Sequence, residues 1–217
     1  MLKHSFSSIK DFTGCARRYH QVRILRRFKS EPTEATLYGE HVHKAFELYL
    51  LNRTPLPEGL VKHQALLDGL LQKNREIRCE QKLGVREDFS PCEFYADDVW
   101  IRGIPDVLMI GTSKAWIADW KTSKSARFAD TSQLELMAAI TMAHYPQVQH
   151  VKGLLAFIVA GTTVSAEYTR DQLPMIWSKW VGQADLIREA MHNDVWNASP
   201  SGLCKFCPVS KDVCEHR

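Results

Sequence analysis

The chain has 217 residues, enough for one domain with a small appendage. Apolar residues make up 45% of it, which suffices for a sizeable core, and 28 basic against 25 acidic residues leave a formal net charge of only +3. This balance neither indicates nor excludes nucleic-acid binding, so the clustering of the basic residues matters more than their number. The polar start MLKHSFSSIK and the lack of an apolar run of roughly 18 residues argue against a signal peptide and a membrane partner. We therefore expect a cytoplasmic protein whose six cysteines are thiols or metal ligands rather than disulfides.

The first half of the chain is predicted to be helical. Ser7 and Ser8 are plausible caps for a first helix, which leads into the basic stretch CARRYHQVRILRRFK. Such a run is more often a solvated helix face than a phosphate-binding surface, and both interpretations stay open here. Two further helices are predicted at 33–51 and 60–78, separated by the helix-breaking stretch TPLPEG.

The second half changes to β-rich runs broken by short polar turns. The predicted strands are CEFYA, DVWIRGIPDVLMI, AWIADWKT, VKGLLAFIVA and TVSAEYT, with helices at 131–144 and 173–192. This order predicts an α/β fold with a central mixed β-sheet flanked by helices. We expect a single domain at 1–217, made of a helical part at 1–78, a sheet core at 79–170, and a C-terminal helix with a cysteine-rich tail at 171–217.

Two carboxylates are predicted to meet at the end of an apolar strand. Asp119 and Lys121 stand two positions apart in AWIADWK, so on a strand they point to the same face. Asp106 lies thirteen residues earlier, after Gly103 and Pro105, which weaken a strand. Adjacent strands would bring Asp106 beside Asp119 and Lys121. Converging carboxylates can hold Mg²⁺ or Mn²⁺, which activates water for attack on a phosphoester, and a lysine can stabilise the developing charge.

Alone, each of these features is more often a surface pair or a turn residue, but their order resembles a known family. GIPD…DWK resembles the Gly-x-x-Asp…Asp-x-Lys core of the PD-(D/E)XK nuclease superfamily, in its RecB-like branch. The resemblance implies a restriction-endonuclease-like core and a metal-dependent DNA nuclease, with an exonuclease favoured. It also implies roles for residues outside the two strands: His43 as a metal ligand, Glu80 as a catalytic carboxylate with Glu76 and Glu93 as alternatives, and Gln133 as the start of a Gln-x-x-x-Tyr motif in which Met137 replaces the tyrosine.

The C-terminal cysteines have the spacing of metal ligands. Cys204 and Cys207 form Cys-x-x-Cys and Cys214 follows, but closed sites usually take four ligands. Cys15 is the preferred fourth ligand because it ends a predicted helix beside basic residues, whereas Cys79 and Cys92 lie in the β-rich region. Spacing alone leaves zinc and an iron–sulfur cluster open.

The stretch SSIKDFTGCARRY resembles the first segment of the iron–sulfur nucleases of this superfamily, which include the AddB-type helicase–nucleases and the small nuclease of CRISPR adaptation. Ala16 stands where those chains often have proline, while Pro208 matches their second Cys-Pro pair. The resemblance implies a 4Fe–4S cluster that ties the two ends of the chain together, held by Cys15, Cys204, Cys207 and Cys214.

The implied substrate is DNA, single-stranded or with free ends, and the implied partners belong to recombination, repair or CRISPR adaptation. Four arginines of the basic stretch are the candidate phosphate contacts: Arg17, Arg18, Arg23 and Arg26. Two alternatives remain, a non-catalytic nucleic-acid-binding module on a nuclease fold and a zinc-stapled hydrolase of another phosphoester. Trp100, Trp116 and Trp120 are expected in the core rather than as base-stacking platforms, with Trp120 on the face opposite Asp119 and Lys121.

Overall fold

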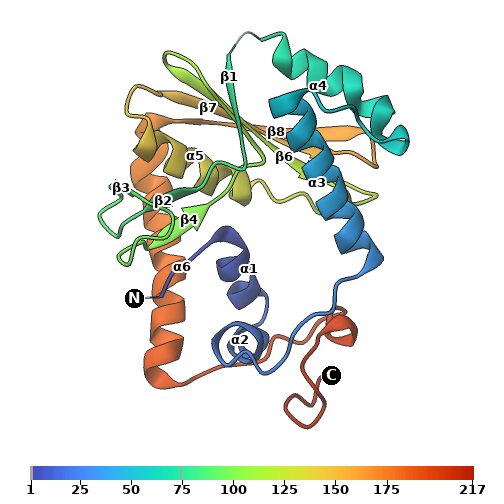
Figure 1. Ribbon diagram of the computed structural model, residues 1–217. Coiled ribbons are helices and arrows are strands. Elements are labelled where there is room, and N and C mark those ends of the chain that lie inside the picture. The colour runs from blue at the N-terminus through green and yellow to red at the C-terminus, as the bar shows by residue number, and fades with distance from the viewer. Residues whose placement is uncertain (1, 74) are drawn as a thin grey trace.

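The computed structural model describes residues 2–73 and 75–217 and shows an α/β fold (Figure 1). A five-stranded sheet lies between two groups of helices, and a small three-stranded sheet lies beside it. The α-helices are α1 (Phe6–Gly14), α2 (Ala16–Tyr19), α3 (Glu34–Asn52), α4 (Gln64–Leu71), α5 (Ser132–His144) and α6 (Leu173–Asn193). The shorter turns are the π-helix η1 (His20–Ile24) and the 3₁₀ helices η2 (Glu58–His63), η3 (Arg170–Gln172) and η4 (Cys204–Phe206). The strands are β1 (Glu76–Cys79), β2 (Leu83–Val85), β3 (Pro91–Cys92), β4 (Ile101–Gly103), β5 (Val107–Ile110), β6 (Lys114–Lys121), β7 (His150–Phe157) and β8 (Thr162–Thr169).

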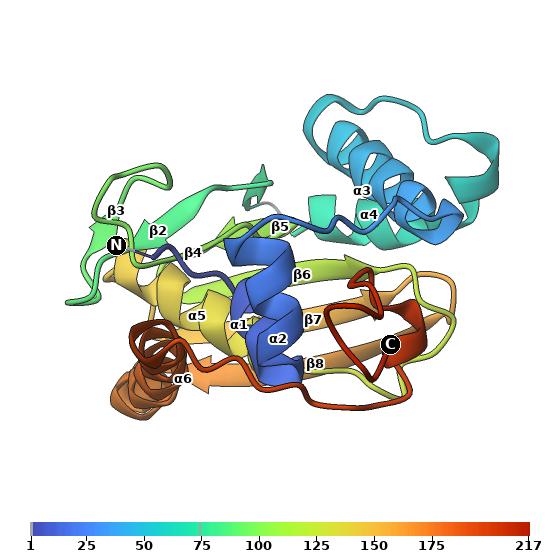
Figure 2. The same cartoon turned by 90° about the horizontal axis from the view of Figure 1, so that it is seen from below.

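The large sheet is mixed, which confirms the predicted fold class. Its strand order is β1-β5-β6-β7-β8, and the small sheet has the order β3-β2-β4. Only β6 and β7 run parallel, and α5 is the crossover that connects them; the other pairs are antiparallel. Figure 2 shows α5, α6, α1 and α2 on one side of the large sheet and α3 with α4 on the other.

Strand β6 explains why both faces of the sheet are covered. Ala115 and Ile117 belong to the core formed with α5 and α6, whereas Trp116, Ala118 and Trp120 belong to the core formed with α3 and α4. This alternation is what a strand buried on both faces requires. The indole of Trp120 lies edge-on to Phe46 of α3, with 5.3 Å between ring centroids. Trp120 therefore packs opposite Asp119 and Lys121, as predicted.

Two predicted elements of the first half differ from the structure. The helix predicted at 60–78 ends with α4 at Leu71, because the leucine periodicity stops there and Ile77 and Cys79 instead alternate onto the α3 side of the sheet as part of β1. The cap of α1 is Ser5, whose hydroxyl accepts the Ser8 N–H at 3.2 Å, rather than Ser7 or Ser8.

Two predicted strands are also wrong in part. The run DVWIRGIPDVLMI is split into β4 and β5, which belong to different sheets, because the chain leaves the small sheet after Gly103 and Pro105 has no N–H to donate. In CEFYA only Cys92 is in a strand, since the Ala96 N–H closes a turn onto the Glu93 carbonyl at 3.0 Å.

The two longest helices, α3 and α6, have 19 and 21 residues, and each mixes buried apolar side chains with charged ones. Among the described helices, none is both long enough and apolar enough to cross a membrane.

The tightest contact between α5 and the large sheet gives a stability prediction. A Cβ added at Gly153 of β7 would lie 2.9 Å from Leu134 Cβ, whereas one added at the exposed Gly182 of α6 would meet nothing within 4 Å. We expect Gly153→Ala to lower the free energy of unfolding by about 1–3 kcal/mol through overpacking. Gly182→Ala, the matched control, should raise it by up to about 1 kcal/mol because alanine favours the helix. Urea denaturation of both variants measures this, and an unchanged midpoint for Gly153→Ala would show that the helix can shift.

Candidate active site

The candidate site lies where β5 and β6 separate. The last residue pair in register is Val107 with Ala118, so Asp106 and Asp119 follow directly on adjacent strands. Past this pair the strands no longer exchange backbone hydrogen bonds, and the Trp120 N–H donates instead to Asp106 Oδ2 at 2.6 Å. Asp106 and Asp119 are only 9% and 6% exposed. The structure thus brings the two predicted carboxylates together at a nearly dry edge of the sheet.

Helix α3 adds an imidazole to this edge. His43 Nε2 lies 2.9 Å from the Trp120 carbonyl oxygen, and Nδ1 lies 3.3 Å from Asp106 Oδ1. Because a carbonyl oxygen only accepts, Nε2 carries the hydrogen, and in the neutral ring Nδ1 has a free electron pair directed toward Asp106. When Nδ1 is also protonated it can donate to Asp106, and this hydrogen bond raises the pKa of His43 above its usual value. An imidazole held through one nitrogen by a backbone carbonyl is the usual arrangement of a metal-ligating histidine.

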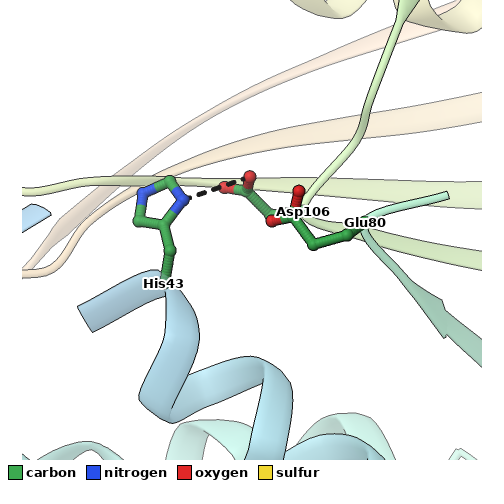
Figure 3. Close-up of side chains that lie close together, drawn as sticks. All are labelled: His43, Glu80 and Asp106. Atoms are coloured by element: carbon green, nitrogen blue, oxygen red, sulfur yellow. Dashed lines mark ion pairs between the residues drawn. The ribbon is translucent and has the colours of Figure 1, made fainter. Parts of the chain in front are cut away.

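Glu80 completes a group of three ligands. It follows β1 with φ of 51°, a left-handed conformation that is costly for a residue other than glycine and is often found at functional sites. Ligand atoms of His43, Glu80 and Asp106 all lie within 4.8 Å of one another (Figure 3). Burial, and then the charge of Asp106, raise the pKa of Glu80. Of the three predicted candidates for this carboxylate, the structure favours Glu80.

The two alternatives lie elsewhere. Glu76 pairs with Arg78 at 2.8 Å, at the far end of β1, and Glu93 is exposed in the turn after β3.

Asp119 and Lys121 form a second arm of the site together with Gln133 of α5. Lys121 Nζ lies 2.6 Å from Asp119 Oδ2 and donates to Gln133 Oε1 at 2.8 Å, while Gln133 Nε2 donates to Asp119 Oδ1. Gln133 therefore fixes both charged groups at once. The motif position of the family's tyrosine is filled by Met137, which is buried against Gly103 and offers no hydroxyl.

The donor set fits a hard divalent cation. It consists of carboxylate oxygens and one imidazole, which suits Mg²⁺ or Mn²⁺. Asp119 Oδ2 is buried, and the Lys121 ammonium lies 2.6 Å from it. Burial first, and the negative charge of Asp106 second, raise the pKa of Asp119. A cation between the two aspartates would offset their repulsion.

The four predicted cysteine ligands meet at the other end of the molecule. Cys15 caps the break between α1 and α2, and the C-terminal tail passes beneath α2 (Figure 2), where the Arg17 N–H donates to the Asn197 carbonyl at 3.1 Å. One small cavity is lined by all four: Cys15, Cys204, Cys207 and Cys214.

Backbone amides point at the sulfurs of this cavity. Cys15 Sγ accepts from the N–H groups of Arg18 and Ser199 at 3.5 Å, and Cys204 Sγ accepts from Ser201 at 3.3 Å. Cys79 and Cys92 lie in β1 and β3, and burial raises the pKa of Cys79 to about 12.

The predicted DNA-contacting arginines are divided between two environments. Arg18 and Arg23 both pair with Asp11, at 2.7 and 2.5 Å, so part of their charge is neutralised within the protein. Arg26 is exposed, and Arg17 lines the cysteine cavity. The prediction did not include Asp11 because a lone acidic residue on a helix carries no signal of its partners.

Comparisons with known proteins found one family model and solved structures that resemble this chain. A model of the PD-(D/E)XK nuclease superfamily matches residues 3–215. A solved structure from Eubacterium rectale, named "Putative exonuclease", is 13% identical, with a TM-score of 0.55 over 97% of this chain and 92% of that one. The structure of SSO0001, also 13% identical, covers 98% of this chain and 84% of that one with a TM-score of 0.46. No curated protein matches the chain.

The raised pKa of Asp119 leads to a prediction about stability without catalysis. Since the folded state disfavours its ionised carboxylate, Asp119→Asn should raise the melting temperature in EDTA by a few degrees. Mn²⁺ at about a hundredfold its dissociation constant should raise the melting temperature of the wild type by about 5–10 °C. It should raise the melting temperature of the variant by much less. Scanning fluorimetry measures both. The exposed Asp98, paired with Arg86 at 2.6 Å, gives the control Asp98→Asn, whose metal response should equal the wild type's. An equal response in Asp119→Asn would remove Asp119 from the metal site.

Proposed function

Because the chain belongs to the PD-(D/E)XK nuclease superfamily, we propose that it is a metal-dependent deoxyribonuclease of the RecB-like branch that hydrolyses phosphodiester bonds at DNA ends. The observation that carries this proposal is the convergence of Asp106, Asp119 and Lys121, with His43 and Glu80, at one edge of the sheet. The exonuclease part is also supported by the name of the Eubacterium rectale structure.

Each side chain then has a role that follows from its position. His43, Glu80, Asp106 and Asp119 would hold Mg²⁺ or Mn²⁺, which when bound polarises a phosphoryl oxygen and makes water more acidic. Lys121 carries a positive charge at the same edge and would stabilise the charge that develops on the phosphoryl group. Gln133 keeps Lys121 pointed toward the site, since its amide oxygen accepts from Nζ. A cleft lies beside the site and is lined in part by Gly39, His43 and Glu80. We expect a DNA strand to enter the site through this cleft.

The cost of the site speaks against a non-catalytic scaffold. Two nearly buried carboxylates raise each other's energy, and Glu80 adopts a left-handed conformation. A protein that only bound nucleic acid would gain nothing from these features, since phosphate binding needs cations rather than buried anions.

Cleavage assays test the proposed roles. Asp119→Ala should abolish the degradation of end-labelled DNA with Mn²⁺, because it removes a metal ligand, while Lys121→Ala should still bind metal and DNA but turn over at least about 100-fold more slowly. Asp98→Ala is the control and should cleave like the wild type.

Circular single-stranded DNA is the control for the need for a free end. It should remain uncut if the enzyme acts at DNA ends, and its cleavage would show that the enzyme is an endonuclease. Full activity of Asp119→Ala would show that this strand is not the active site.

We also propose that the four cysteines hold a 4Fe–4S cluster. Among the described residues, no three of the cysteine sulfurs all lie within 4.8 Å of one another. A tetrahedral zinc site with Zn–S of about 2.3 Å would bring all its sulfurs to about 3.8 Å of one another. The cavity that the four cysteines line together suits a cluster, in which irons and sulfides lie between the ligands.

Metal analysis tests this second proposal. Anaerobically purified protein should be brown and contain about four irons per chain, and Cys15→Ser or Cys204→Ser should lose the colour. Cys92→Ala is the matched control, because Cys92 is buried in β3 away from the cavity, and it should keep its iron. Zinc in place of iron would contradict the proposal, and full iron retention in Cys15→Ser would mean that another residue is the fourth ligand.

Phosphate contacts of the arginines in α2, η1 and the following segment remain part of the proposal. The exposed Arg26 has no such internal ion pair and is the best placed of the four, whereas Arg18 and Arg23 would have to share their charge with Asp11.

A further inference from the structure

A short turn sits in the loop that joins two residues of the site. Lys121 ends β6 and Gln133 lies in the first turn of α5, so the loop at 122–131 joins two residues that hydrogen-bond to each other in the site. Within it, the Ala129 N–H donates to the Ala126 carbonyl at 3.0 Å and closes a turn whose two central residues are Arg127 and Phe128.

The loop is anchored on both sides of this turn. Thr122 lies against Gly39 of α3, where an added Cβ would come within 3.3 Å of the Thr122 hydroxyl, and Gly39 lines the cleft that also contains His43. Ala126 and Ala129 pack onto the hydrophobic core on either side of the turn. Asp130 pairs with Lys10 of α1 and accepts the Ser132 N–H at 3.0 Å. These contacts on both sides of the turn hold Arg127 and Phe128 in place at the surface.

Folding does not account for a phenylalanine at this position. Phe128 is 86% exposed, the largest exposed fraction among the large hydrophobic side chains described. The central positions of turns favour glycine, asparagine, aspartate and serine, none of which resembles phenylalanine. The Arg127 guanidinium carbon lies 5.4 Å from the centre of the Phe128 ring, and Lys124 is exposed in the same loop. An aromatic ring with two neighbouring cations is the combination that binds unpaired nucleic acid.

We propose that this turn grips an unpaired DNA strand beside the active site, with Phe128 stacking on a base and Arg127 pairing with the backbone. This inference rests on the proposed nuclease function and adds a preference for unpaired strands. A base inside a duplex already stacks on both faces, so only a single strand or a frayed end offers a free face to the ring. Phe128 is five residues from Gln133, which limits the separation of their Cα atoms to about 18 Å. At about 3.4 Å per nucleotide of a stacked strand, this Cα separation spans about five nucleotides, and the lengths of the side chains add to it.

Single-turnover cleavage tests the proposal with the full-length protein and Mn²⁺. Wild type, Phe128→Ala, Phe128→Trp and Arg127→Ala are compared on one oligonucleotide, as a single strand and as a blunt duplex. We expect Phe128→Ala to raise the protein concentration for half-maximal cleavage of the single strand about 5- to 100-fold, with little change in the saturating rate. Phe128→Trp should keep the half-maximal concentration of the wild type, because an indole ring can also stack on a base. Arg127→Ala should weaken binding and reduce its salt dependence.

Tyr95→Ala is the matched control. Tyr95 is also an exposed aromatic residue in the centre of a turn, with Lys82 Nζ 5.0 Å from its ring, but its turn joins β3 and β4 rather than the two site residues. Tyr95→Ala should therefore cleave both substrates like the wild type.

A second measurement uses the fluorescence of 2-aminopurine, placed in turn at each of the first eight positions of the strand. The wild type should quench it at one position, and Phe128→Ala should not.

The outcomes separate this inference from the function on which it rests. A wild type that cleaves DNA while Phe128→Ala has the same half-maximal concentration and the same quenching would overturn the inference and leave the nuclease intact. A wild type that cleaves neither substrate would overturn both. Equal weakening on the single strand and on the blunt duplex would also overturn it, since it would show a general contact rather than recognition of unpaired bases.

Discussion

The Asp106 carboxylate is the point on which the geometry of the site depends, and the backbone of one residue of β6, Trp120, holds it in place. The Trp120 N–H donates to Asp106 Oδ2, and the Trp120 carbonyl accepts from His43, whose other nitrogen faces Asp106 Oδ1. The start of β5 and helix α3 are thus joined through the two polar backbone groups of Trp120. The indole of Trp120 is buried between the sheet and Phe46, so the hydrophobic core fixes the backbone that fixes the site.

The same arrangement makes the site expensive in folding free energy. Asp119 is buried beside Asp106, and its raised pKa shows that Lys121 does not fully offset the loss of water and the like charge. Gln133 limits this cost by donating to Asp119 and accepting from Lys121, which keeps the pair aligned. Such a loss of stability is the cost that the proposed cation site would impose on the fold.

The sequence predicts the parts of the site that depend on side-chain identity and local period. The i, i+2 spacing of Asp119 and Lys121 and the Cys-x-x-Cys pair need only a strand and a turn, and both are found. The role of Trp120 cannot be predicted in this way, because it orients Asp106 and His43 through its backbone N–H and carbonyl, which every residue except proline also has. The choice of Glu80 over Glu76 depends on where β1 begins, and leucine periodicity places a helix there instead. The splitting of β4 from β5 depends on which sheet each strand joins, and that long-range pairing leaves no local pattern.

Helix α1 connects the cysteine cavity to the loop that carries Phe128. The strength of this connection depends on how much each contact of α1 contributes to the free energy of folding. Cys15 caps its C-terminal end, Ile9 is buried in the main core, and Lys10 pairs with Asp130 at the end of the loop. The Lys10 pair is largely exposed and is worth at most about 1 kcal/mol, whereas burying an isoleucine side chain contributes about 1.5–3 kcal/mol. The core therefore holds α1 even when the cysteine ligands are lost, and the loop keeps its frame.

The described part of the tail has fewer apolar anchors: Val209 is buried, and Trp196 packs against the core. Leu203 and Phe206 are each 73% exposed, and η4 has only three residues, so little apolar burial orders the segment that carries Cys204 and Cys207. A ligand centre that joins Cys15 to residues about 190 positions later closes nearly the whole chain, and such a closure restricts the unfolded state more than a short one, though only logarithmically. A metal centre at the four cysteines would thus act mainly on the tail and on α2, and it would reach the candidate active site through α1.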